Sequence, residues 1–254
     1  LLAFVSAPPL PLEDFVGGIS TKNWQALLNN IKRPLVHKTI QGQYPPGSIY
    51  KIVTALAGLA KGVINSNTVF YCSGSMKFGN RRYGCWKESG HGPVSLHRAL
   101  AESCDVYFYQ VGLKVGVDSL AEYANRMGLG HKTGIDFEYE KSGLIPTAAW
   151  KKLAKGVSWQ EGETLSIAIG QGFNSVTPLQ VAQMTSALAN GGILYKPLLI
   201  EKIIDPEGDV IKEFEPRIDV ELIGMGKNLA LIREGMVGAV NDRHGPGKAA
   251  PLNE

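Results

Sequence analysis

The sequence predicts an α+β fold in which a helical lobe is inserted between strand-rich segments. Apolar residues recur at helical spacing through the middle of the chain, whereas β-branched runs lie near both ends. Of the 254 residues, 44% are hydrophobic and 19% are charged, a composition typical of a globular protein that can bury a core. We therefore expect one partial domain over residues 1–254, with the helical lobe at residues 65–190.

Each element is predicted from its apolar spacing and from the residues that start or stop it. The two prolines before Gly47 delay a helix until Ser48, and Gly62 ends it. Pro178 and the stretch NGG bound another helix, and the turn DPEG joins two β-rich runs. The predicted helices cover residues 23–28, 49–61, 95–113, 119–127, 177–190 and 219–241. The predicted strands cover residues 1–5, 192–204 and 209–214. The stretch IGQG at residues 169–172 is interpreted as a tight turn, with a close backbone approach as the alternative.

The charge pattern gives no support to nucleic-acid binding. The net charge is +3, and the 26 basic residues are scattered along the chain without forming a cluster. The longest run of apolar and small residues, 52–60, is far too short to cross a bilayer. The chain begins at Leu1 within an apolar run and stops at Glu254 after a turn rich in Gly and Pro. We therefore expect a fragment, whose missing N-terminus could carry a membrane anchor.

A serine and a lysine lie three positions apart in the stretch PPGSIYK, where an apolar helix begins. Residues three apart share a helix face, so Ser48 and Lys51 can meet. A serine hydroxyl needs a base within hydrogen-bond reach to attack a carbonyl, and a lysine serves when desolvation or a nearby cation favours its neutral form. The alternative is an N-cap serine followed by a solvated lysine, which these residues alone do not exclude.

A second serine favours the catalytic interpretation. In ALAESCDVYFYQVG, Ser103 and Asp105 have the S-x-[ND] spacing that accompanies S-x-x-K in serine acyl-transferases that also bind penicillin. Ser103 can relay a proton between Lys51 and a leaving amine, and Asp105 can orient the lysine or the substrate. The alternative is a hydrogen-bonding pair at a helix turn.

Five blocks in order carry a family resemblance: FVGGIS, IQGQYPPGSIYKIVTALAGL (with Ile40 where leucine is usual), ESCDVYFYQVG, GLGHKTGIDFEYEKSGLIPT and SIAIGQGFNSVTPLQVAQMTSALANGG. Together they resemble the transpeptidase domain of class B penicillin-binding proteins, in the elongation-specific branch of Gram-negative bacteria. The resemblance implies a penicillin-binding/β-lactamase-like fold, an antiparallel sheet flanked by helices with an inserted all-helical lobe. It also implies that Ser48 is the acylated nucleophile, Lys51 its base, and Ser103 and Asp105 the second motif.

The family's third motif, K-[ST]-G on a strand, has two apparent matches, Lys132-Thr133-Gly134 and Lys141-Ser142-Gly143. Both are rejected, because they lie in a loop-rich segment soon after the second motif. In relatives the motif follows a helix that corresponds to residues 219–241, and its strand supplies an oxyanion-hole donor. Loss of one such donor slows acylation by roughly 10²- to 10³-fold, so we expect a chain that stops at Glu254 to react poorly with penicillins.

Three cysteines and a histidine have the spacing C-x12-C-x5-H-x12-C, formed by Cys72, Cys85, His91 and Cys104. Thiolate and imidazole ligands suit tetrahedral Zn²⁺, whereas a Cys72–Cys85 disulfide or buried free thiols are the alternatives. The resemblance favours zinc, since some relatives carry a metal site of two aspartates, a histidine and a cysteine in this region. In this chain cysteines replace the two aspartates, which makes the site softer, and Cys104 would hold the second motif in place.

The resemblance implies a peptidoglycan D,D-transpeptidase that cross-links stem peptides ending in D-Ala-D-Ala and is acylated by β-lactam antibiotics. It implies a periplasmic domain of an inner-membrane-anchored protein, working with a SEDS-type glycosyltransferase and the machinery of cell elongation and rod shape. The alternatives are a β-lactamase or β-lactam sensor, and a non-catalytic scaffold for a cell-wall polymerase.

Overall fold

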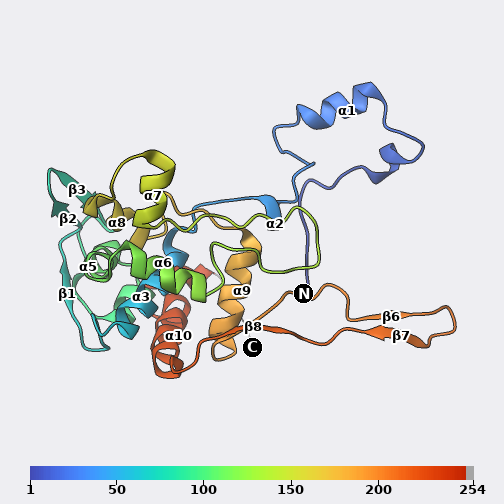
Figure 1. Ribbon diagram of the computed structural model, residues 1–254. Coiled ribbons are helices and arrows are strands. Elements are labelled where there is room, and N and C mark those ends of the chain that lie inside the picture. The colour runs from blue at the N-terminus through green and yellow to red at the C-terminus, as the bar shows by residue number, and fades with distance from the viewer. Residues whose placement is uncertain (250–254) are drawn as a thin grey trace.

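Helix α3 (Lys51–Ala60) lies at the centre of the helical body, because its sequence KIVTALAGLA is apolar or small apart from Lys51 and Thr54. Every residue from 51 to 58 is buried. The helix packs against α5 (Asp105–Val115), α6 (Val117–Arg126) and α10 (Gly226–Asn241). The structure is a computed structural model that describes residues 1–249 (Figure 1).

The remaining helices surround this centre or extend from it. They are α1 (Thr21–Leu28), α2 (Lys38–Gln41), α4 (Leu96–Ala101), α7 (Ala148–Lys155), α8 (Glu161–Ala168) and α9 (Pro178–Ala189), with the short 3-10 helices η1 (Leu12–Phe15), η2 (Gly47–Tyr50) and η3 (Pro246–Ala249). Helix α9 matches its prediction, since Thr177 and Gln180 form a capping box and Pro178 occupies the first turn. Helix α6 agrees with the predicted helix at 119–127 within two residues.

The strands are short, and within residues 1–249 all of them pair antiparallel in twos. They are β1 (Phe70–Cys72), β2 (Ser75–Phe78), β3 (Arg81–Gly84), β4 (Gly92–Val94), β5 (Ile193–Tyr195), β6 (Lys202–Ile204), β7 (Val210–Glu213) and β8 (Ile218–Glu221). The pairs are β1 with β4, β2 with β3, β5 with β8, and β6 with β7. The α+β class is therefore confirmed. The predicted all-helical lobe is wrong at residues 70–94, where Gly-rich turns let four strands fold back on one another.

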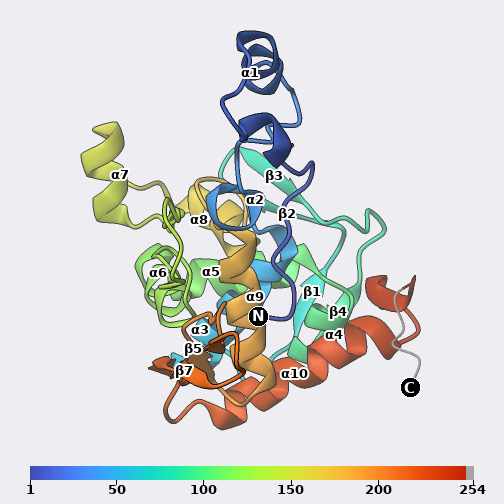
Figure 2. The same cartoon turned by 90° about the vertical axis from the view of Figure 1, so that its right-hand side faces the viewer.

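Two segments project from the body in Figure 1, and Figure 2 shows the first of them from another side. One is the arm that carries η1 and α1, and α1 has no buried residue. The other is the β6–β7 hairpin, whose turn is the predicted DPEG. No helix among residues 1–249 is long and apolar enough to cross a membrane.

Three predicted boundaries are wrong for tertiary reasons. The helix expected at 95–113 is divided into α4 and α5, because Ser103 has a φ of 53° that interrupts the helical hydrogen bonds. The helix expected from 219 begins at Gly226, since β8 pairs with β5. Residues 1–5, expected as a strand, have no strand partner among the described residues.

Candidate active site

Ser48 lies in the short helix η2 just before α3, not at an N-cap. Pro45 and Pro46 direct the chain into this turn, and the Ser48 side chain is exposed. The Gly47 N–H donates a hydrogen bond to Gly170 O at 3.0 Å. Gly170 has a φ of 72°, and a Cβ placed on it would overlap Gly47 O. The stretch IGQG is therefore both a turn and a close backbone approach beneath the loop that carries Ser48.

Lys51 is the first residue of α3, and only 2% of its surface is accessible. Its Nζ donates to Ser103 O at 2.9 Å, to Ser103 Oγ at 2.9 Å and to Asp105 Oδ1 at 2.7 Å. A lysine ammonium has three N–H donors, so each donor has one acceptor. All three acceptors belong to the second motif, which the break between α4 and α5 brings to the start of α3. The solvated-lysine alternative is thus wrong.

Ser103 connects the lysine to the first serine. Its Oγ lies 3.1 Å from Ser48 Oγ and 2.9 Å from Lys51 Nζ. Among the hydrogen bonds of the described residues, none joins Ser48 directly to Lys51. The structure therefore brings the four predicted residues Ser48, Lys51, Ser103 and Asp105 together, and the route from Ser48 to Lys51 passes through Ser103.

The three cysteines and His91 converge next to this group. Cys72 ends β1, Cys85 follows β3, His91 precedes β4, and Cys104 precedes α5. All four are buried, and their candidate ligand atoms lie within 4.8 Å of one another. The three thiols are free, so the structure does not form the disulfide alternative.

The donor set fits a tetrahedral Zn²⁺ ion. His91 Nδ1 lies 3.5 Å from Cys72 Sγ and 3.5 Å from Cys85 Sγ. Zinc bonds of about 2.3 Å to sulfur and about 2.0–2.1 Å to nitrogen give a tetrahedral N···S edge of about 3.6 Å. The other ring nitrogen, His91 Nε2, is buried and has no hydrogen-bond partner among the described residues, and the Glu102 carboxylate lies 3.8 Å from it.

The thiols also differ in acidity. A hydrogen bond from the Cys104 side chain lowers the pKa of Cys85 to about 5. The same interaction, with burial, raises the pKa of Cys104 well above its ordinary value. One thiolate is therefore stabilised in the cluster even before a cation is bound, which suits metal ligation.

Neither rejected K-[ST]-G match has the strand geometry of a third motif. Thr133 is buried, its Oγ1 donates to Glu140 Oε1 at 2.6 Å, and its backbone N–H donates to the same oxygen at 2.8 Å. Ser142 O accepts a hydrogen bond from Gln180 Nε2 at 2.8 Å. Both segments lie outside the strands and are engaged in loop packing, which supports their rejection.

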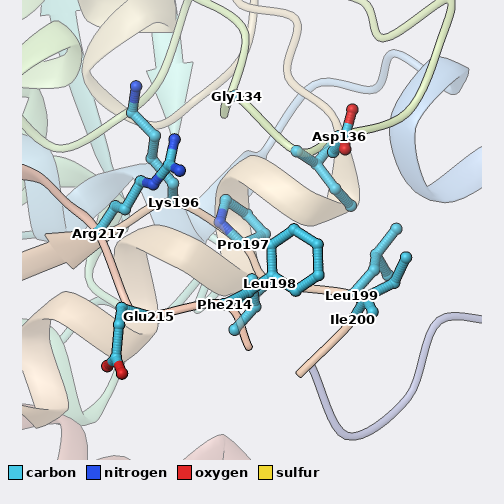
Figure 3. A pocket seen from close by; sticks show the side chains of 11 residues that line it. Gly134, Asp136, Lys196, Pro197, Leu198, Leu199, Ile200, Phe214, Glu215 and Arg217 are labelled. Carbon is cyan, nitrogen blue, oxygen red and sulfur yellow. The ribbon is translucent and has the colours of Figure 1, made fainter. Parts of the chain in front are cut away.

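A separate pocket of about 430 Å³ lies at the base of the β6–β7 hairpin. Figure 3 shows Lys196 and Arg217 on one side of it and Leu199 and Ile200 on the other. None of the predicted site residues lines this pocket.

One residue at the site was not singled out from the sequence. Trp86 follows Cys85, and its backbone N–H donates to Asp105 Oδ2 at 3.0 Å. Its indole Nε1 donates to Glu102 O at 2.9 Å and Ser103 O at 3.1 Å. In the sequence, only the position of Trp86 next to the candidate metal ligand Cys85 could have indicated that it lies at the site.

A buried lysine linked to an exposed serine through a second serine is the arrangement of the serine acyl-transferases of the penicillin-binding class. The family model "Penicillin binding protein transpeptidase domain" matches residues 16–253. The chain belongs to this family.

Two curated proteins of this family match nearly the whole chain. The chain is 38% identical to the peptidoglycan D,D-transpeptidase MrdA of Haemophilus influenzae, over 98% of this chain and 39% of the relative. It is 37% identical to MrdA of Escherichia coli K12, over 96% of this chain and 39% of the relative. The chain thus spans about two fifths of the length of these curated relatives.

Two solved structures of PBP2 proteins share the fold. PBP2 of Helicobacter pylori, in a complex with MreC, superposes with a TM-score of 0.87 at 35% identity, over 96% of this chain and 44% of that chain. PBP2 of Pseudomonas aeruginosa gives a TM-score of 0.86 at 36% identity, over 98% of this chain and 54% of that chain. These comparisons confirm the family and the fold that the five ordered sequence blocks predict.

Proposed function

We propose that this chain carries the acylation site of a peptidoglycan D,D-transpeptidase, with Ser48 as the nucleophile. The observation that carries the proposal is the hydrogen-bonded chain from Ser48 through Ser103 to Lys51 and Asp105. The curated relatives of the family have this activity in their names. The substrate is then a stem peptide ending in D-Ala-D-Ala, for which a β-lactam amide substitutes.

In the reaction, Ser48 Oγ attacks the carbonyl carbon of the penultimate D-alanine. Lys51 must first lose one of its three ammonium protons, and with it one of the three hydrogen bonds that its Nζ donates. Ser103 then passes the Ser48 proton to the neutral Lys51 amine. The C–N bond to the terminal D-alanine breaks, and the same relay returns the proton to the leaving amine. An amine from a neighbouring stem peptide then attacks the acyl-enzyme, and its proton restores the Ser48 hydroxyl.

Asp105 has an electrostatic part in this scheme. Its Oδ1 lies 2.7 Å from Lys51 Nζ, and Lys51 is almost fully buried. In this low-dielectric position the carboxylate stabilises the positive charge that develops on the lysine when it takes up the proton. It also holds the amine beside Ser103 Oγ.

Cys72, Cys85, His91 and Cys104 are proposed to hold one structural Zn²⁺ ion. Four protein ligands complete a tetrahedral shell, so the ion supplies rigidity to the segments that carry its ligands. Cys104 lies between Ser103 and Asp105 in the chain, so fixing its thiolate fixes both neighbours. Metal analysis of the purified full-length gene product is expected to find about one zinc ion per chain. Absence of zinc together with a Cys72–Cys85 crosslink in mass spectrometry would overturn this proposal.

The cellular setting is proposed from the relatives. The PBP2 of H. pylori was solved in a complex with MreC, and another structural neighbour belongs to a peptidoglycan synthase complex. We infer a periplasmic domain, anchored in the inner membrane, that works with a SEDS-type glycosyltransferase in cell elongation. Co-purification of the full-length gene product with such a glycosyltransferase tests this assignment, and repeated failure to co-purify would contradict it.

The test of the reaction is acylation of the full-length gene product by fluorescent penicillin. Mass spectrometry is expected to locate a stable adduct on Ser48, and Ser48→Ala is expected to abolish it. Rapid turnover of a chromogenic cephalosporin without a stable adduct would indicate a β-lactamase instead. No adduct and no turnover, in a folded protein, would favour the scaffold alternative.

A further inference from the structure

Trp86 lies in the loop after β3, beside the candidate metal ligand Cys85, and donates hydrogen bonds to Glu102, Ser103 and Asp105. Its indole and backbone N–H groups reach the residues on both sides of Cys104. We propose that Trp86 is a positioning residue, which holds Ser103 and Asp105 in the geometry that the proton relay needs. This inference rests on the acyl-transfer function proposed for Ser48.

The Ser103 backbone is in a conformation that needs support. Its φ of 53° is in the left-handed region, where the side chain of a residue other than glycine crowds the backbone. This conformation separates α4 from α5 and directs Ser103 Oγ to 3.1 Å from Ser48 Oγ. Two donors hold the Ser103 carbonyl: Lys51 Nζ at 2.9 Å and the Trp86 indole at 3.1 Å.

The indole is the one of these two donors that does not take part in the proposed proton transfer. Lys51 changes its hydrogen bonds whenever it accepts or releases a proton, so its hold on the carbonyl varies through the reaction. The Trp86 N–H keeps its proton throughout, and it also donates to Glu102 O at 2.9 Å. Trp86 therefore gives Ser103 a constant anchor while Lys51 changes partner.

Asp105 is oriented from two sides. Its Oδ1 accepts from Lys51 Nζ at 2.7 Å, and its Oδ2 accepts from the Trp86 backbone N–H at 3.0 Å. The carboxylate plane is thus fixed between the lysine and the Trp86 loop. A side-chain substitution leaves the backbone donor in place, so variants at this position test the indole separately.

The size of the effect follows from one shared hydrogen bond. The Trp86 side chain is largely exposed (57% of the residue), so water competes for its N–H and for the two carbonyls. A net hydrogen bond contributes about 0.5–1.5 kcal/mol, and a loss of this size while Lys51 changes partner slows acylation by about two- to twelvefold.

The experiment measures the binding constant and the acylation rate constant of a fluorescent penicillin by stopped flow, on the full-length gene product. Trp86→Phe removes the indole N–H, and replacement of Trp86 by 3-benzothienylalanine removes it while keeping the ring shape. Replacement of Trp86 by 4-fluorotryptophan keeps both the indole N–H and the ring shape. Trp24→Phe is the matched control, since Trp24 lies on the projecting α1 (Figure 1).

We expect the phenylalanine and benzothienylalanine variants to lose about two- to twelvefold in acylation rate constant and about 1–6 °C in melting temperature, with binding constant and zinc content unchanged. The fluorotryptophan variant and the control are expected to react at the wild-type rate. A wild-type rate in the benzothienylalanine variant overturns the inference, as does a loss that is matched by loss of zinc. Absence of labelling at Ser48 in the wild-type protein overturns the proposed function itself.

Discussion

Replacing Gly170 by alanine is predicted to displace the turn that carries Ser48. A Cβ at this position would overlap Gly47 O and would lie 2.7 Å from both Gly47 N and Tyr50 Cβ. Tyr50 is fully buried and Gly47 contributes only backbone atoms to the contact. Neither can relieve the overlap by a change of rotamer, as the end of a flexible side chain could. The strain therefore falls on the residues on both sides of Ser48.

Gly172 provides the matched control for this substitution. It has a φ of 70°, against 72° at Gly170, but a Cβ there meets only Ile167 Cδ1 at 3.3 Å and Ser166 Cβ at 3.5 Å. Both alanine variants carry the left-handed penalty of about 1–2 kcal/mol, which cancels when the two are compared. Overpacking adds about 1–3 kcal/mol at Gly170 alone, which corresponds to a melting temperature about 2–12 °C lower in a domain of this size.

The assay combines thermal unfolding with the rate of acylation by fluorescent penicillin. Gly170→Ala is expected to melt below Gly172→Ala and to be acylated more slowly, because the Ser48 turn is displaced from Ser103. Equal melting temperatures and equal acylation rates in the two variants would refute the close approach as the reason for glycine at this position.

Three further predictions concern the relay, a rejected motif and the metal. Lys51→Met is expected to reduce acylation by about 10²- to 10⁴-fold and to destabilise the fold by about 3–5 kcal/mol, because it removes the base and leaves Asp105 without its cation. Lys61→Met, in an exposed ion pair, is the control and should change stability by less than about 1 kcal/mol in unfolding titrations. Thr133→Ala is expected to lose about 1–2 kcal/mol through its bond to Glu140 and to leave acylation unchanged, so a selective loss of acylation would restore that motif as a candidate. Removing zinc with a chelator is expected to lower the melting temperature by about 5–10 °C if the ion is present at 100 times its dissociation constant, and calorimetry that shows no shift would contradict the zinc site.

The candidate catalytic residues that the structure brings together are those with a recognisable local spacing. Ser48 and Lys51 are three positions apart, and Ser103 and Asp105 are two apart, so each pair is visible in a short stretch. The four candidate metal ligands were selected because thiolate and imidazole groups are the ligands that suit tetrahedral Zn²⁺. Local spacing also predicted α9, where the cap residues of the helix are neighbours in the chain.

The wrong boundaries of α5 and α10 share one physical cause, which is contact between distant residues. Helical periodicity continues through Ser103, yet the chain breaks there because Lys51, 52 residues earlier, holds the Ser103 carbonyl. The start of α10 is delayed because residues 218–221 pair with β5. The role of Trp86 was not seen, since an exposed tryptophan has no sequence pattern that reveals the partners of its N–H.

The sequence by itself determined the α+β class, the family, the central apolar helix α3 and the identity of the candidate catalytic and metal-binding residues. These depend on composition, periodicity and ordered motifs, which are properties of neighbouring residues. Only the tertiary structure decided that Ser103 lies between Ser48 and Lys51, that Gly170 packs against the Ser48 turn, and that the four candidate metal ligands converge. The reason is that hydrogen bonds and close packing act between atoms in space, and chain separation does not encode those distances.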